Sequence, residues 1–165
     1  MSEQKTVAFH TLGCKVNQYD TQAMRERFEQ AGYRTTEFDE RADIYVVNTC
    51  TVTGTGDKKS MQIIRRCRRQ NPLAQIVVTG CLAQRAADEL TLPGVRLVLG
   101  TQRRGEVVEL LEQAMASQKN RWDDQQEQMA SVKEQIESLS QQNEQIRKEI
   151  EKIEREKSLK QERIG

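Results

Sequence analysis

Apolar runs of strand length alternate with amphipathic segments of helix length over the first two thirds of the chain. Five strands are expected, at residues 7–12, 33–38, 44–49, 75–79 and 96–99. Four helices are expected between and after them, at residues 17–30, 58–70, 83–90 and 105–116. This alternation predicts an α/β domain with a mostly parallel, flavodoxin-like sheet and flanking helices, followed by a long coiled-coil helix.

The link between the second and third expected strands is too short for a helix. Only Asp39 to Asp43 separates them, whereas a parallel crossover usually takes about a dozen residues or more. We therefore expect residues 33–38 to form an edge strand, and the sequence leaves its direction open.

The hydrophobic period changes after Ser117. Apolar side chains are then spaced three and four residues apart in turn, along a seam formed by Met129, Val132, Ile136, Leu139, Asn143, Ile146, Ile150 and Ile153. This spacing predicts coiled-coil self-association or pairing with a partner helix, rather than a single solvated helix. Asn143 at an a position favours two parallel strands. Glu149 and Glu154 would face each other in a parallel homodimer, so antiparallel and hetero-oligomeric pairing also stay open.

Composition divides the chain at the same place. Both prolines, all four cysteines and every glycine except Gly165 precede Ser117, so we expect two domains, residues 1–116 and 117–165. The net charge of +1 argues neither for nor against a nucleic-acid partner. The sequence shows neither the roughly 20 apolar residues of a membrane span nor a signal-peptide core. We therefore expect no membrane partner and a cytoplasmic location, where cysteines stay reduced.

Three cysteines each follow a predicted strand directly. Because the carboxyl ends of neighbouring parallel strands meet at one edge of a sheet, Cys14, Cys50 and Cys81 are expected to cluster there. Three thiolates without a histidine favour an iron–sulfur cluster with one open iron over a closed zinc site. For any single cysteine the alternative is a small buried apolar side chain.

Four other residues, Gly13, Gly80, Cys67 and His10, are expected to have roles other than ligation. Gly13 and Gly80 precede two of the cysteines, where a glycine allows a tight turn and brings the sulfur close to a bulky inorganic core. Cys67 lies in the middle of a predicted helix, so packing or simple exposure is its expected role. His10, inside the first strand, is expected to be a core or edge residue rather than a ligand.

The segments that carry the cysteines resemble a known enzyme family. They are Thr11-Leu12-Gly13-Cys14-Lys15-Val16-Asn17 with Tyr19-Asp20-Thr21, Asn48-Thr49-Cys50-Thr51-Val52-Thr53 with Asp57-Lys58-Lys59-Ser60, and Val78-Thr79-Gly80-Cys81-Leu82-Ala83-Gln84. All three are similar to motifs of the radical-SAM methylthiotransferases, which insert a methylthio group into tRNA adenosines or a ribosomal-protein aspartate. The Cys-Thr-Val-Thr form most resembles the branch that acts on N6-threonylcarbamoyladenosine in tRNA.

The resemblance covers about residues 6–116 and has direct implications for the cysteines. It implies that Cys14, Cys50 and Cys81 ligate an auxiliary [4Fe–4S] cluster, whose free iron handles the sulfur to be transferred. It also implies tRNA as a partner.

The residues after Ala116 depart from this family. The resemblance implies a radical-SAM barrel next, with a Cys-x3-Cys-x2-Cys loop that holds a second cluster and cleaves S-adenosylmethionine, and then a small RNA-binding domain. The four cysteines do not have that spacing, so the chain is expected to be inactive alone. It would be an isolated cluster domain joined to a coiled coil, or a truncated or rearranged product. The alternative is a non-enzymatic module, a flavodoxin-like domain oligomerised by the coil without a cluster.

Six basic residues lie on one predicted helix with Asp57 as its only acid: Lys58, Lys59, Arg65, Arg66, Arg68 and Arg69. Such a density of positive charge suggests contact with RNA phosphates. The alternative is a solvated face that keeps the domain soluble, since no aromatic residue is interleaved with the charges.

Overall fold

The structure, a computed structural model, describes residues 3–13, 15–50 and 54–164. It divides into two compact units, Met1–Ser117 and Gln118–Gly165. The first unit contains all the strands, and the second consists of the greater part of one long helix.

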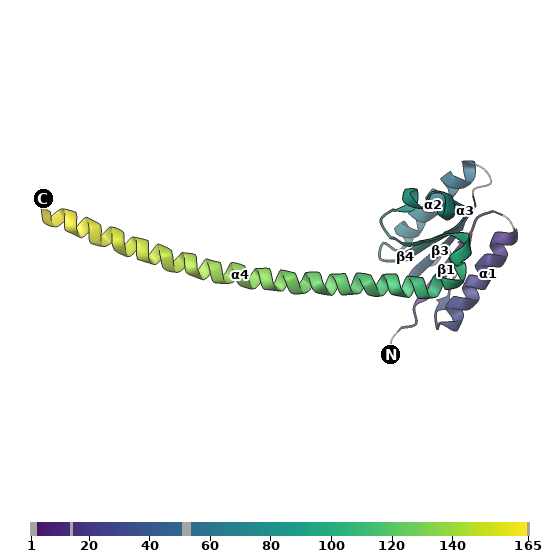
Figure 1. The fold of residues 1–165 in the computed structure, drawn as a ribbon, viewed down its shortest axis with the longest axis horizontal. Helices are drawn as coiled ribbons and strands as arrows, with labels where there is room; N and C mark the ends of the chain where they lie inside the picture. The colour runs from purple at the N-terminus through teal and green to yellow at the C-terminus, as the bar shows by residue number, and fades with distance from the viewer. Residues whose placement is uncertain (1–2, 14, 51–53, 165) are drawn as a thin grey trace. The chain divides into compact units, whose positions relative to one another are not determined.

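The first unit is built on a five-stranded sheet in the order β2-β1-β3-β4-β5. Figure 1 labels the three inner strands β1, β3 and β4. The strands are β1 (Thr6–Thr11), β2 (Arg34–Thr35), β3 (Ile44–Thr49), β4 (Gln75–Gly80) and β5 (Val95–Leu99). All neighbouring pairs are parallel, which confirms the predicted α/β fold. β3 is buried along its whole length, as expected for a central strand covered on both faces.

Strand β2 lies at the edge of the sheet and runs parallel to β1. It has only two residues, fewer than the predicted strand at 33–38, and it pairs with Thr6 and Val7 at the start of β1. Val7 also pairs with Ile44, the first residue of β3. The chain that leaves β2 is therefore already level with the start of β3. It needs no helix to connect the two strands in parallel.

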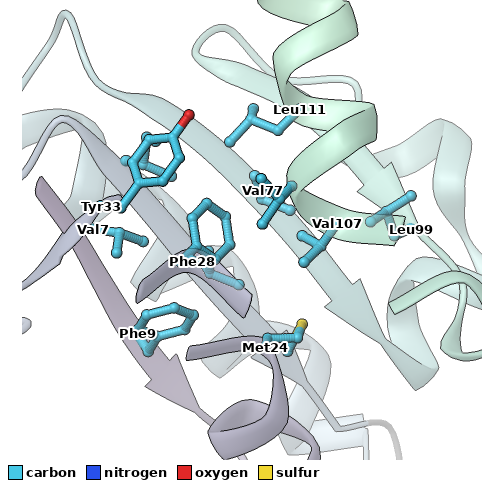
Figure 2. Close-up of a cluster of buried hydrophobic side chains, with 12 residues drawn as sticks. Val7, Phe9, Met24, Phe28, Tyr33, Val77, Leu99, Val107 and Leu111 are labelled. Carbon is cyan, nitrogen blue, oxygen red and sulfur yellow. The ribbon is translucent and has the colours of Figure 1, made fainter. Parts of the chain in front are cut away.

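Helices cover both faces of the sheet. They are α1 (Lys15–Gln30), α2 (Gly54–Gln70), α3 (Cys81–Arg85) and α4 (Val107–Ile164), with two 3-10 turns, η1 (Ala87–Leu90) and η2 (Thr101–Glu106). On one face, Met24 and Phe28 of α1 pack with Val107 and Leu111 of α4 (Figure 2). On the other face, Ile64 of α2 and Leu82 of α3 share a second core.

Several predicted helices differ from the observed ones. α2 begins at Gly54 rather than Lys58, so Asp57 lies in its first turn and does not cap it. The predicted helix at 83–90 is a short α-helix followed by a 3-10 turn, because the backbone of Ala86 leaves the helical region, with φ −136° and ψ 49°. The helix expected at 105–116 begins at Val107 and continues unbroken to Ile164.

The second unit is helical throughout its described length, and every residue from Gln118 to Ile164 is exposed. Its apolar seam is exposed with the rest: Met129 is 65% and Ile146 is 53% accessible. Within the described residues, none of the helices combines the length and apolar character that a membrane crossing requires.

Candidate functional site

The carboxyl ends of β1, β3 and β4 lie level with one another at one edge of the sheet. Thr11 pairs with Asn48, and Asn48 pairs with Thr79. One residue further, the backbone N–H of Leu12 donates to the carbonyl of Asn48 at 2.8 Å. The three segments that carry the predicted ligands therefore leave the sheet side by side.

Two of the predicted ligands follow a registered pair of residues. Thr49 and Gly80 pair across β3 and β4, and Cys50 and Cys81 come directly after them. Both thiols are free; Cys50 is partly exposed and Cys81, the first residue of α3, is exposed. The structure thus places these two cysteines directly after adjacent strand ends, with access to solvent.

The third predicted ligand, Cys14, lies outside the described residues, as do Thr51, Val52 and Thr53 of the second motif. Within residues 3–13, 15–50 and 54–164, no three His, Cys, Asp or Glu side chains gather as a metal-binding group. The chain immediately before Cys14 nevertheless reaches this edge, because Gly13 contacts Cys50.

Gly13 and Gly80 allow close packing at the edge that holds the cysteines. Their φ angles are +96° and +100°, in a backbone region that residues other than glycine rarely adopt. A Cβ on Gly13 would lie 2.7 Å from Cys50 Sγ, and a Cβ on Gly80 would lie 2.2 Å from the carbonyl oxygen of Thr49. The space that a Cβ would need is taken by Cys50 at the first position and by the Thr49 backbone at the second, so the two glycines let the segments before Cys14 and Cys81 pack directly against the end of β3. The donors that these segments carry are soft thiols, the ligand type that an iron–sulfur core takes.

Asn17 of α1 bridges the ends of β1 and β3. Its side-chain amide donates to the carbonyl of Leu12 at 2.9 Å and to the carbonyl of Thr49 at 3.1 Å. Asn17 is only 5% exposed, so water cannot easily replace either hydrogen bond. Leu12 and Thr49 lie two residues before Cys14 and one before Cys50. One amide therefore sets the spacing of the two segments that lead to these cysteines.

Asn48 and Thr49 extend this network across the sheet. The Asn48 amide donates to the carbonyl of Asn17 at 3.0 Å and to Thr21 Oγ1 at 3.1 Å, while the Thr49 hydroxyl donates to the carbonyl of Thr79 at 2.7 Å. Asn48 Oδ1 and Thr79 Oγ1 are buried and have no hydrogen-bond partner among the described residues. The strand ends are thus cross-linked by side chains inside the fold, which stiffens the platform beneath the cysteines.

Sequence reasoning gave Asn17 and Asn48 no role, although both occur in the quoted motifs. For Asn48 a signal exists: it interrupts the apolar run Ile44–Val47 of a central strand, where a polar side chain must find internal partners. No comparable signal marks Asn17, which lies on a helix that carries many polar residues.

An ion pair and hydrogen bonds fix α3, the helix that begins with Cys81. Arg85 pairs with Asp57 of α2, and Gln84 Oε1 accepts a hydrogen bond from the backbone N–H of Thr101 at 3.3 Å. α2 itself begins four residues after Cys50. The Arg85–Asp57 pair therefore links the segments that follow both cysteines.

Cys67 and His10 contact other parts of the domain. Cys67 is fully buried in the α2 core, which confirms the packing role, and burial raises the pKa of its thiol to about 12. The thiol stays protonated near neutral pH and is not a competing thiolate ligand. His10 is half-buried on β1 with its ring centroid 4.6 Å from that of Phe38. Burial, assisted by Arg66, lowers its pKa.

The basic residues of α2 are all exposed or partly exposed, as a phosphate-binding face would require: Lys58, Lys59, Arg65, Arg66, Arg68 and Arg69. Arg66 is engaged within the domain, because it pairs with Asp39 and lies over the Phe38 ring at 5.5 Å from the centroid. Lys58 and Lys59 lie near the start of α2, close in sequence to Cys50.

Comparisons with known proteins agree with the motifs. The sequence model of the family described as "Uncharacterized protein family UPF0004" matches residues 6–100. The chain is 56% identical over 109 residues to the threonylcarbamoyladenosine tRNA methylthiotransferase MtaB of Bacillus subtilis (strain 168). The matched region covers 66% of this chain and 24% of the relative. The chain is 47% identical over 108 residues to the protein of the same name from Aquifex aeolicus (strain VF5), covering 65% and 26%.

A more distant relative has a different substrate in its name. The ribosomal protein uS12 methylthiotransferase RimO of Synechococcus sp. (strain CC9311) is 33% identical over 121 residues, covering 72% of this chain and 25% of the relative. The chain spans about a quarter of the length of these curated relatives.

Proposed function

We infer the function of the chain from its family: it belongs to the UPF0004 family and carries the N-terminal domain of methylthiotransferases. From this we propose that residues 6–116 bind the auxiliary [4Fe–4S] cluster of a tRNA-modifying methylthiotransferase that acts on N6-threonylcarbamoyladenosine. The two relatives with the highest identities quoted above are named for that substrate, and the Cys-Thr-Val-Thr sequence at residues 50–53 favours the same branch.

One observation carries the proposal: Cys50 and Cys81 follow a registered residue pair on adjacent strands, and Gly13 lies against the Cys50 sulfur. Cys14, Cys50 and Cys81 would hold the cluster, and Cys14 directly follows Gly13 in the sequence. Three protein ligands leave one iron open, and the bound group would supply a site for the sulfur that is transferred. The chain's own contribution is to hold the segments that lead to these cysteines, through the hydrogen bonds of Asn17 and Asn48 between α1 and the ends of β1 and β3 and through the Thr49 hydroxyl on the carbonyl of Thr79.

The exposed basic face of α2 supports tRNA as the partner. Lys58 and Lys59 lie one turn into a helix that starts close to Cys50, so phosphates bound there would bring RNA near the cysteine edge. Arg65, Arg68 and Arg69 extend the positive charge along the same helix.

Iron analysis after anaerobic reconstitution tests the cluster. The wild-type chain should bind about four irons per molecule, with sulfide in equal amount. Cys14→Ala, Cys50→Ala and Cys81→Ala should each lose most of that iron, because two remaining thiolates cannot hold the cluster firmly. Cys67→Ala is the matched control and should keep it, since this thiol is buried and protonated.

Two results would refute the assignment. Iron loss in Cys67→Ala equal to that in the other three variants would show that iron binding reports folding rather than ligation. A wild-type chain that binds no more iron than a variant lacking all four cysteines would favour the alternative, an interaction module without a cluster.

A further inference from the structure

The apolar seam of α4 has no partner among the described residues. Its apolar side chains from Met129 to Ile153 are all 49% or more accessible, and Met129, Val132 and Ile136 line a groove on the helix surface. Trp122 lies seven residues before Met129 and is 62% exposed, so it extends the same a positions by one heptad. A helix with so long an apolar stripe gains stability by burying it against another helix.

We propose that the partner of this seam is a second copy of the chain, aligned in parallel and in register. The proposal concerns the second unit alone and goes beyond the cluster-binding function. Asn143 and the charges that flank the seam decide the direction.

Asn143 strongly favours the parallel, in-register alignment. There, a positions meet a positions, so the two Asn143 amides face and can hydrogen-bond each other. In an antiparallel alignment a positions meet d positions, and Asn143 would face an aliphatic side chain such as Ile146 of the second copy. Each amide left unsatisfied in this way would weaken association by a factor of roughly 5 to 150.

The flanking charges have the opposite preference, but their effect is smaller. A parallel dimer places Glu149 near Glu154 of the second copy, twice by symmetry. The antiparallel alignment with Asn143 opposite Ile146 would instead pair Lys133 with Glu154, again twice. Such exposed pairs change association by only about twofold each. The unsatisfied amides therefore outweigh the charges, and the parallel alignment prevails.

Glu154→Lys tests the direction, because its effect has opposite signs in the two alignments. In the parallel dimer the introduced ammonium group would face Glu149 and replace two repulsions by two attractions, so association should tighten roughly tenfold. In the antiparallel dimer the same group would face Lys133, and association should weaken by a similar factor. The dissociation constant of the full-length chain is measured by sedimentation equilibrium at several concentrations.

Glu134→Lys is the matched control for this change of charge. Glu134 lies at the outward f position, away from the seam in both alignments, so its dissociation constant should change by less than about twofold. Ile146→Asp should abolish the dimer by burying a charge at a d position, while iron binding by the first unit stays unchanged.

Three results would overturn the proposal. They are weaker association of Glu154→Lys than of Glu134→Lys, a wild-type chain that stays monomeric at the highest concentration, and an assembly larger than two. None of them affects the iron content of the reconstituted protein, so they are independent of the cluster assignment.

Discussion

Gly80→Ala should destabilise the first unit far more than an ordinary glycine substitution. Gly80 ends β4 with φ +100° and ψ −166°, a backbone conformation that is essentially restricted to glycine. Its position at the end of β4 also brings it against the neighbouring strand. An added Cβ would lie 2.2 Å from the Thr49 carbonyl oxygen, 2.7 Å from the Thr49 nitrogen and 2.8 Å from Asn48 Oδ1.

Both effects add to the cost of the substitution. Forcing alanine into this conformation costs about 1–3 kcal/mol. The clash is with backbone atoms of a buried central strand, which cannot move aside, and overpacking of this kind typically costs about 1–3 kcal/mol more. The expected loss is therefore about 2–6 kcal/mol, a large share of the roughly 5–15 kcal/mol that stabilises a typical domain.

Gly32→Ala is the matched control. Gly32 also has a positive φ, +91°, but nothing lies within 4 Å of the position that its Cβ would occupy. The Gly32→Ala variant should therefore lose only the stability that corresponds to the strained backbone conformation, about 1–2 kcal/mol. The difference between the two variants isolates the close approach of β3 and β4 next to Cys50 and Cys81.

Urea unfolding of the cluster-free protein provides the measurement. Near-UV circular dichroism follows mainly the first unit, because Tyr33 and Tyr45 are buried in its two cores whereas Trp122 of the second unit is exposed. Under conditions where Gly80→Ala remains folded, it should also bind iron less tightly, since separating Thr49 from residue 80 separates the cysteines that follow them. Equal losses of stability in Gly80→Ala and Gly32→Ala would refute the reasoning, because strand contact would then contribute nothing.

Two further predictions concern the network beneath the cysteines and the pH dependence of stability. Asn17→Ala leaves the carbonyls of Leu12 and Thr49 without their donor, so the first unit should lose about 1–3 kcal/mol of stability and release iron to a chelator faster. Gln18→Ala, on the exposed side of α1, is the control. Equal rates of iron release from the two variants would contradict the positioning role of Asn17. Burial, together with the hydrogen bond to Glu112, raises the pKa of Tyr33 from 10.0 to about 12, so the native state holds its proton longer than the unfolded state. The free energy of unfolding should therefore fall as the pH rises from about 10 to about 12, and Tyr33→Phe should reduce this fall. An equal fall of the free energy of unfolding in the wild type and in Tyr33→Phe over this pH range would contradict the prediction.

The cysteine edge illustrates how much of the site local sequence could predict. Cys50 and Cys81 each follow a run of β-branched residues, and the alternation of strands and helices predicts parallel strands whose ends meet. The predicted positions of most strands and helices lie close to the observed ones for the same reason, since the hydrophobic period and the turn residues are local properties of the sequence. The boundaries of α2 and α3 differed where the backbone leaves or enters the helix at residues without a strong capping signal.

The seam of α4 was also determined by sequence alone. Its three-and-four spacing needs no tertiary contact to be recognised, and the structure adds that these side chains are exposed on a helix that runs unbroken from Val107. The continuity of that helix was not predicted, because the change in composition near Ser117 suggests a boundary where the backbone has none.

The remaining features depend on tertiary structure. The direction of β2 follows from its pairing with the first residues of β1, which no local pattern records. The glycines at 32 and 80 both have positive φ, yet only the second lies against a neighbouring strand. Asn17 acquires its role from a carbonyl 32 residues away. The sequence by itself determined the order of elements, the cysteines at strand ends and the helical seam, because these depend on neighbours along the chain. Register and contact between distant segments were decided only when the strands packed side by side.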